Sequence, residues 1–255
     1  MDGARAANEC VRPEFFQPWV KQAMKPTLGT FFILSLIAGF ADTATFIHLS
    51  GLFSSHVTGN FVLLAASLQK SVGGEEELLK ILALPVFVLA VATATLIHDR
   101  LRRDEAEAVL DRRLAPAAGT LLLLGAGLAF LYGRPGGTGP MNLADAAAGM
   151  IAVVAMGVQN AIHRFAAPLG PPTTVMTGNV TQLTVMASRR LARGPDRAEK
   201  APAAQAFSLP GLAWLAFAFA SGCAISAVLT LAWGLTSLAV PGLLLIAASL
   251  WNRSG

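Results

Sequence analysis

The sequence has few charged residues and almost no tyrosine. Only 13% of its 255 residues are charged, and it holds a single Tyr. Soluble domains carry about 25% charged residues, so this chain lacks the polar surface that a soluble domain of its length needs. Because 54% of its residues are hydrophobic and its mean hydropathy is +0.58, we expect an integral membrane protein.

The basic residues argue against a nucleic-acid-binding protein, and the cysteines argue against a disulfide or a metal site. The net charge is +4, but the basic residues lie in short segments between apolar blocks and form no aromatic-interleaved groove for bases. Nucleic acid is therefore not an expected partner. Cys10 lies in a polar tail and Cys223 in an apolar segment, which argues against a disulfide, and neither has metal-ligand spacing. The sequence predicts no metal, cofactor or catalytic residue.

Long apolar segments account for most of the chain. A membrane-spanning helix needs about 20 apolar residues, and the range is about 17–25. The second and sixth segments fall short of this range, whereas the other six reach it. Residues 1–27 contain no apolar signal-peptide core and are predicted to form a cytoplasmic N-terminal tail. The eight segments are 28–51, 56–69, 78–98, 115–132, 143–163, 173–188, 207–233 and 235–251.

Both short segments carry the same tripeptide, Thr-Gly-Asn. Thr58 and Thr177, which begin the two copies, are 119 residues apart. A second pair of motifs has nearly the same offset, since Asp42 and Asn160 are 118 residues apart. Two matches at nearly one offset predict a duplication within a single transmembrane domain, residues 28–251, with repeats at 28–132 and 143–251.

The distribution of Lys and Arg tests whether the short segments cross the bilayer, because cytoplasmic loops carry an excess of both. If both segments re-enter, 16 of the 19 basic residues lie on the cytoplasmic side, including those of the 99–113 loop. If both cross, only 13 do. We therefore expect an all-α membrane protein with six full transmembrane helices and two re-entrant or broken ones. Three spans per half make the repeats inverted. The alternative is seven or eight spans.

These motifs resemble those of a known family. Gly39-Phe40-Ala41-Asp42 with the segment from Phe53 to Asn60 is similar to the first signature of the YoaK-like family of uncharacterised multi-pass membrane proteins. The segment from Ala155 to Asn160 with that from Thr173 to Asn179 resembles its second signature. The resemblance covers roughly residues 28–250 and implies a membrane architecture without a known substrate. Position 56 is His where the family more usually has Met.

Asp42 and the two tripeptides are the candidate binding residues. Thr and Asn are natural helix N-caps, and a helix that begins at depth would direct free N–H groups into a polar cavity. A carboxylate within an apolar span costs about 2.5–3.5 kcal/mol, so it marks a site or has a partner. The predicted substrate-binding set is Asp42, Thr58, Gly59, Asn60, Gln159, Asn160, Thr177, Gly178 and Asn179.

This set favours a transporter or channel for a small polar solute, coupled to protons or cations through Asp42. An intramembrane enzyme is an alternative, although no catalytic motif lies within the apolar spans. A structural or assembly protein is another, with the small-residue motifs serving only to pack helices. The expected partners are the lipid bilayer and an unidentified solute, and a homo-oligomer is compatible with the sequence. The expected location is a bacterial-type inner membrane, with the N-terminus cytoplasmic.

Overall fold

The computed structural model describes residues 28–67, 74–102, 109–134, 140–166, 172–174, 176–193 and 208–251. Within these ranges the chain forms helices and no strands, which confirms the predicted all-α class. The predicted N-terminal tail, residues 1–27, lies outside the described residues. So do residues 103–108 within the predicted 99–113 loop.

Among the residues that the structure describes, five stretches are long and apolar enough to cross a membrane. Four correspond to single helices, which are α1 (Leu28–His48), α3 (Glu75–Arg102), α4 (Val109–Tyr132) and α5 (Leu143–Ala166). The fifth, Leu209–Leu250, comprises α8 (Leu209–Trp233), the 3-10 helix η4 (Gly234–Leu238) and most of α9 (Ala239–Trp251). At about 1.5 and 2.0 Å per residue, α9 and η4 together extend about 30 Å, the thickness of a bilayer core.

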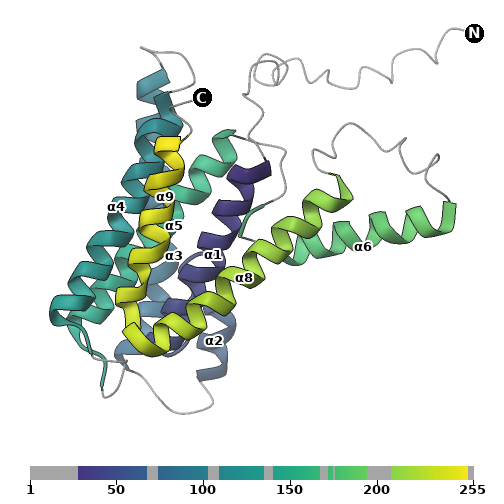
Figure 1. Ribbon diagram of the computed structural model, residues 1–255. Helices are drawn as coiled ribbons and strands as arrows, with labels where there is room; N and C mark the ends of the chain where they lie inside the picture. Colours follow the sequence, from purple (N-terminus) through teal and green to yellow (C-terminus); the bar gives the residue numbers. More distant parts are fainter. Residues whose placement is uncertain are drawn as a thin grey trace, which may run out of the picture.

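The two helices that carry the tripeptides are different from these. Helix α2 (Gly59–Ser67) has 9 residues, so it is about 14 Å long, less than half the hydrocarbon thickness of about 30 Å. Helix α6 (Met176–Arg193) has 18 residues but is not among the candidate spans. It projects sideways from the bundle (Figure 1).

Residues in the left-handed region of φ end two of the long helices. Helix α1 stops at His48, and Ser50 and Gly51 follow with φ of 51° and 94°. Helix α8 stops before Gly234, which has a φ of 55° and donates its N–H to the carbonyl of Thr230. Glycine takes such a φ without the steric cost of a Cβ. The chain can therefore reverse between α8 and α9, which run in opposite directions (Figure 1).

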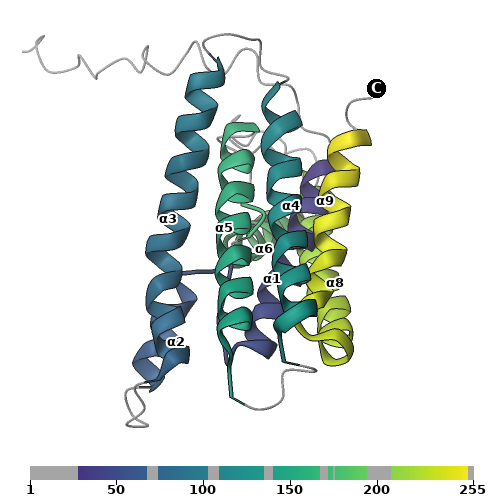
Figure 2. The ribbon, with the colours of Figure 1, turned by 90° about the vertical axis from the view of Figure 1, so that its left-hand side faces the viewer.

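The long helices lie side by side with alternating direction (Figures 1 and 2). Helices α1 and α5 run in opposite directions, as do α3 and α8, and α4 and α9. The most extensive packing joins α1 to α8 and α4 to α5, followed by α4 with α9 and α3 with α5. Helix α5 thus lies between α3 and α4 with its inner face buried.

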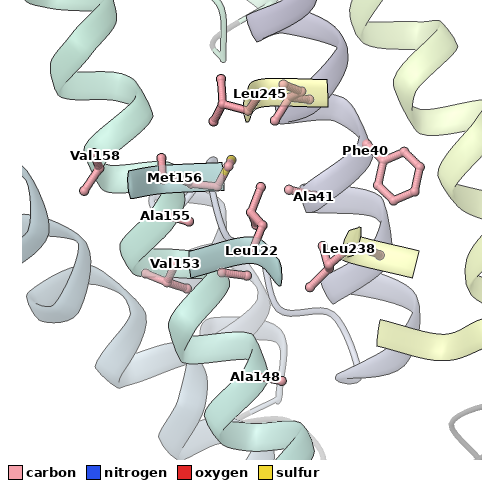
Figure 3. Packing of buried hydrophobic residues seen from close by; sticks show 14 of the residues in the cluster. Phe40, Ala41, Leu122, Ala148, Val153, Ala155, Met156, Val158, Leu238 and Leu245 are labelled. Atoms are coloured by element: carbon pink, nitrogen blue, oxygen red, sulfur yellow. The ribbon is translucent and has the colours of Figure 1, made fainter. Parts of the chain in front are cut away.

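Small residues allow the helices to approach closely. Ala148 and Ala155 of α5 are fully buried, and Ala155 lies with Met156 near Leu122 of α4 (Figure 3). At the α1–α8 contact, a Cβ placed on Gly39 would collide with the backbone carbonyl of Phe219. Because lipid offers no hydrophobic drive for association, close packing of small residues is the means by which membrane helices associate.

Candidate functional site

Asp42 of α1 organises the loop that precedes α2. The residue is 3% exposed, and its carboxylate accepts five hydrogen bonds from three successive residues of that loop. Oδ1 accepts from Ser54 Oγ (3.2 Å), Ser55 N (2.6 Å) and His56 N (3.4 Å). Oδ2 lies 2.7 Å from Ser55 Oγ and 2.6 Å from His56 Nδ1. Asp42 therefore has partners, and they come from the loop.

These bonds require the chain to turn back after α1. Asp42 lies six residues before the end of α1 at His48, about 9 Å up the helix at 1.5 Å per residue. The loop must rise by this distance to bring Ser55 and His56 beside it. Helix α2 then runs back, and Ser50 Oγ donates to Glu76 Oε1 at 2.6 Å. The end of α1 and the beginning of α3 are thus neighbours.

Asn60 closes the same loop. Its Oδ1 accepts from the N–H of Phe53 (2.9 Å), and its Nδ2 donates to the carbonyl of Phe53 (3.0 Å). Thr58 is exposed, and none of the hydrogen bonds of the described residues involves its hydroxyl. The asparagine of the tripeptide, not the threonine, therefore holds the turn.

The first turn of α2 also differs from the expectation that its N–H groups are free. The N–H groups of Gly59, Asn60 and Phe61 donate to the carbonyls of His56, Val57 and Thr58. The expected free N–H groups at this helix start are therefore already bonded, because tight three-residue turns precede the helix. Any binding at this end must use side chains.

The turn between α5 and α6 repeats the two sequence separations that the hydrogen bonds of the first turn span, 14 and 7 residues. Thr174 Oγ1 donates to Asn160 Oδ1 at 3.0 Å, across 14 residues, as His56 and Asp42 are joined across 14. Asn179 Nδ2 donates to the carbonyl of Pro172 at 2.6 Å, across 7 residues, as Asn60 and Phe53 are joined across 7. Each loop is thus fastened to its long helix and closed on itself in the same way.

The two turns differ in charge. The first joins a carboxylate to a histidine whose side chain is 28% exposed. The second joins two neutral groups, and Asn160 also donates to the carbonyl of Met156 at 2.9 Å. The Asp42–His56 pair thus joins an acidic and a basic side chain, whereas the Asn160–Thr174 pair contains neither.

The predicted site residues form two clusters. Gln159 lies where α1 and α5 cross, and its Nε2 donates to the carbonyl of Leu34 at 3.0 Å. On α1, Asp42 lies eight residues beyond Leu34. On α5, which runs the other way, Asn160 lies one residue beyond Gln159, so the two residues lie on opposite sides of the Gln159–Leu34 contact. Asp42 and Asn160 are therefore about 13 Å apart along the helix axes. Helix α2 packs on α3, and α6 packs on α8, so the turns do not meet in one shared contact.

A third polar cluster was not predicted. Asp145, at the start of α5, is fully buried and lies 3.2 Å from His48 Nε2 and 2.6 Å from Arg134 Nε. Arg134 also donates from Nη2 to the carbonyl of His48 at 2.8 Å. Only a weak signal for this cluster is present in the sequence, an acidic residue at one span end and a basic residue in a loop. This cluster fastens the end of α1 to the beginning of α5.

A metal site receives no support from these clusters. Among the residues that the structure describes, no three His, Cys, Asp or Glu side chains lie together as ligands for a metal ion. What the arrangement supplies is a paired acid and base at Asp42 and His56, with hydroxyl and amide groups at the two turns.

Comparison with known proteins gives a family and no assigned activity. Neither the curated proteins nor the solved structures contain a match to this chain. A family model for proteins of unknown function matches residues 30–251, which is nearly the whole predicted transmembrane domain and includes both tripeptides. The chain is therefore a helical membrane protein that belongs to the DUF1275 family of proteins of unknown function.

Proposed function

We propose that this protein is a membrane transporter or channel for a small polar solute, built from two inverted repeats. The observation that carries the proposal is the pair of loops that return along a long helix. Each is fastened across 14 residues and closed across 7. Non-helical backbone within a membrane is tolerated where protein or a wet cavity surrounds it, and paired broken helices are typical of transporter sites.

In this proposal α2 and α6 are re-entrant. The Ser50–Glu76 hydrogen bond supports this for α2, because it joins the end of α1 to the beginning of α3. The opposite directions of α1 and α5, of α3 and α8, and of α4 and α9 support the inversion (Figures 1 and 2). The N-terminus and the 99–113 loop are cytoplasmic, and the membrane is the inner membrane of a bacterial-type cell.

The solute would contact the exposed beginnings of the two short helices. Thr58, Thr177 and Gly178 are exposed, so the hydroxyl groups of the two threonines are accessible while Asn60 and Asn179 support the turns from behind. The half-buried His56 lies between this surface and the carboxylate of Asp42. Coupling to protons or cations would act on this pair, since the second turn holds Asn160 in the place of Asp42.

A structural or assembly protein is the second candidate, and one observation favours it. The Asp42 carboxylate already accepts five hydrogen bonds, so its burial has a structural explanation without a solute. In this alternative the loops serve only to lock α1 to α2 and α5 to α6. We propose no enzymatic activity for either candidate.

Solute uptake by proteoliposomes tests the proposal. Wild type and Asp42→Asn should be compared at two pH values with a panel of labelled polyols, amides, amino acids and inorganic ions. We expect one solute class to enter wild-type vesicles in a pH-dependent way and Asp42→Asn to lose that dependence while remaining folded. Thr58→Val and Thr177→Val should lower uptake more than stability. If no panel member enters and Asp42→Asn is only less stable, the structural candidate is the better one.

A further inference from the structure

Four buried side chains near the crossing of α1 and α5 have polar atoms that make no hydrogen bond to the described residues. Among the described residues, five of their atoms are buried without a hydrogen-bond partner: Ser35 Oγ, Gln159 Oε1, both ring nitrogens of His163, and Thr173 Oγ1. All four residues are at most 2% exposed. An unsatisfied buried polar group is costly, and most buried polar side chains in proteins have a partner. So many in one region therefore require an explanation.

Contacts of these residues and of their neighbours place three of the four together. Gln159 and His163 are one helical turn apart on α5, and so are Phe31 and Ser35 on α1. The ring of His163 meets that of Phe31 edge-on with centroids 5.3 Å apart. Gln159 Nε2 donates to the carbonyl of Leu34, next to Ser35. The facing turns of α1 and α5 thus bring Ser35, Gln159 and His163 to one contact.

Thr173 joins this cluster from the loop before α6. The next residue, Thr174, donates to Asn160 Oδ1 at 3.0 Å, and Asn160 follows Gln159 on α5. The loop that carries the second tripeptide is therefore bonded to α5 one residue beyond Gln159, with the buried Thr173 next to that bond. The first turn has no such extension among the described residues, because the hydroxyls of Ser54 and Ser55 are bonded to Asp42.

The chemistry of the cluster defines what it can bind. We infer that Ser35, Gln159, His163 and Thr173 form a binding site for a small uncharged molecule that both donates and accepts hydrogen bonds. Two hydroxyls and an imidazole can each donate or accept, and Gln159 Oε1 accepts. None of the four side chains carries a fixed charge, and a buried ion without a counter-charge would be costly. Water and a small amide or polyol share the required chemistry.

This inference rests on the proposed function in one respect: the bound molecule would be the transported solute on its path beside the α5–α6 turn. The binding itself does not depend on transport. Binding and uptake are therefore measured separately, so that either claim can fail alone.

The binding test uses the full-length protein in detergent and two matched pairs of probes. Acetamide and acetate have nearly the same shape and differ in charge, as do urea and guanidinium. We expect the uncharged member of a pair, at millimolar concentration, to raise the thermal unfolding temperature of the wild type, and the charged member to leave it unchanged. Equal shifts with both members would overturn the assignment to an uncharged ligand.

Three variants remove the unused atoms with little change of shape: Ser35→Ala, Thr173→Val and His163→Phe, which keeps a ring against Phe31. Each should weaken binding of the uncharged probe about two- to ten-fold, the equivalent of one hydrogen bond. The matched control is Ser226→Ala, which removes a buried hydroxyl that already donates to the carbonyl of Phe40 at 2.8 Å. This variant should be less stable but bind the probe as the wild type does.

The unfolding temperatures of the same variants, measured without a probe, distinguish a cluster that holds water from an empty one. If ordered water is the ligand, the probes cause no shift in the wild type, and the three variants unfold at lower temperature than the wild type. If the atoms have no ligand, no probe binds and the variants unfold at higher temperature, because an unsatisfied polar atom has been removed; that result overturns the inference. Binding without uptake would leave the site in place and refute transport, whereas uptake unchanged in the variants would separate the site from the solute path.

Discussion

His56 Nδ1 lies 2.6 Å from Asp42 Oδ2, although the two residues belong to different segments. Asp42 is on a long helix and His56 in the loop that returns along it. Because the same carboxylate also accepts from Ser54 and Ser55, one buried side chain sets the depth to which the loop returns. The family resemblance led us to expect Met at position 56, and a Met side chain could not make this bond.

The first prediction concerns this pair. His56→Met should lower the free energy of unfolding by about 1–2 kcal/mol, because a hydrogen bond to a charged group is worth about 1.5–3 kcal/mol and His56 is partly exposed. Asp42→Ala should cost more, since it leaves Ser55 N and Oγ without their acceptor. Denaturant unfolding in detergent measures both. Equal stability of Asp42→Ala and wild type would show that the loop is not held by the carboxylate.

The second prediction separates the two polar residues of the tripeptide. Asn60→Ala should cost about 1–3 kcal/mol, because it removes two hydrogen bonds and leaves the N–H of Phe53 unpaired. Thr58→Val should change stability by less than about 0.5 kcal/mol, since its side chain is exposed. Unfolding of the two variants side by side is the measurement. The reverse order of stabilities would restore the threonine as the helix cap.

The third prediction concerns the contact between α1 and α8. A Cβ on Gly39 would meet the carbonyl of Phe219, and one on Gly222 would meet that of Leu36. Gly39→Ala should therefore cost about 1–3 kcal/mol through overpacking. Gly127→Ala in α4 is the control, because nothing lies within 4 Å of its Cβ position. It should be neutral or stabilising by up to about 1 kcal/mol through helix propensity.

The fourth prediction concerns the buried ion pair. Asp145→Asn should lower the free energy of unfolding by about 3–5 kcal/mol, because Arg134 and His48 lose a fully buried charged partner. Glu75→Gln, at an exposed position in the first turn of α3, is a matched change of charge and should leave unfolding nearly unchanged. A small effect of Asp145→Asn would mean that the cluster does not fasten α1 to α5.

The fifth prediction tests the re-entrant arrangement. Single cysteines at Ser50, Gly74 and Arg164, in a background without Cys10 and Cys223, should be probed in intact cells with an impermeant thiol reagent. Ser50→Cys and Gly74→Cys should both react from outside, and Arg164→Cys only after permeabilisation. Reaction of Ser50→Cys and Gly74→Cys from opposite sides would show that α2 crosses the membrane.

The membrane class and the approximate helix positions could be predicted from the sequence because both depend on local properties. Apolar run length decides whether a helix can cross a bilayer, so the predicted segment 143–163 corresponds closely to α5 at Leu143–Ala166. The shortness of the segment around Thr58 likewise anticipated α2, with 9 residues. Asp42 is conspicuous in the sequence for the same reason, since a carboxylate inside an apolar run is costly wherever the run folds.

The partners of these residues were decided only by the tertiary structure. Asp145 pairs with His48 across 97 residues and Gln159 reaches Leu34 across 125, and no local pattern specifies which helices meet at those points. Hydropathy gives the length of a helix but not its neighbour, because apolar faces are nearly interchangeable in lipid. Which helices become neighbours is decided by small residues such as Gly39 and by the few buried polar groups. The bonds of these groups form only once α1, α5 and α8 are packed.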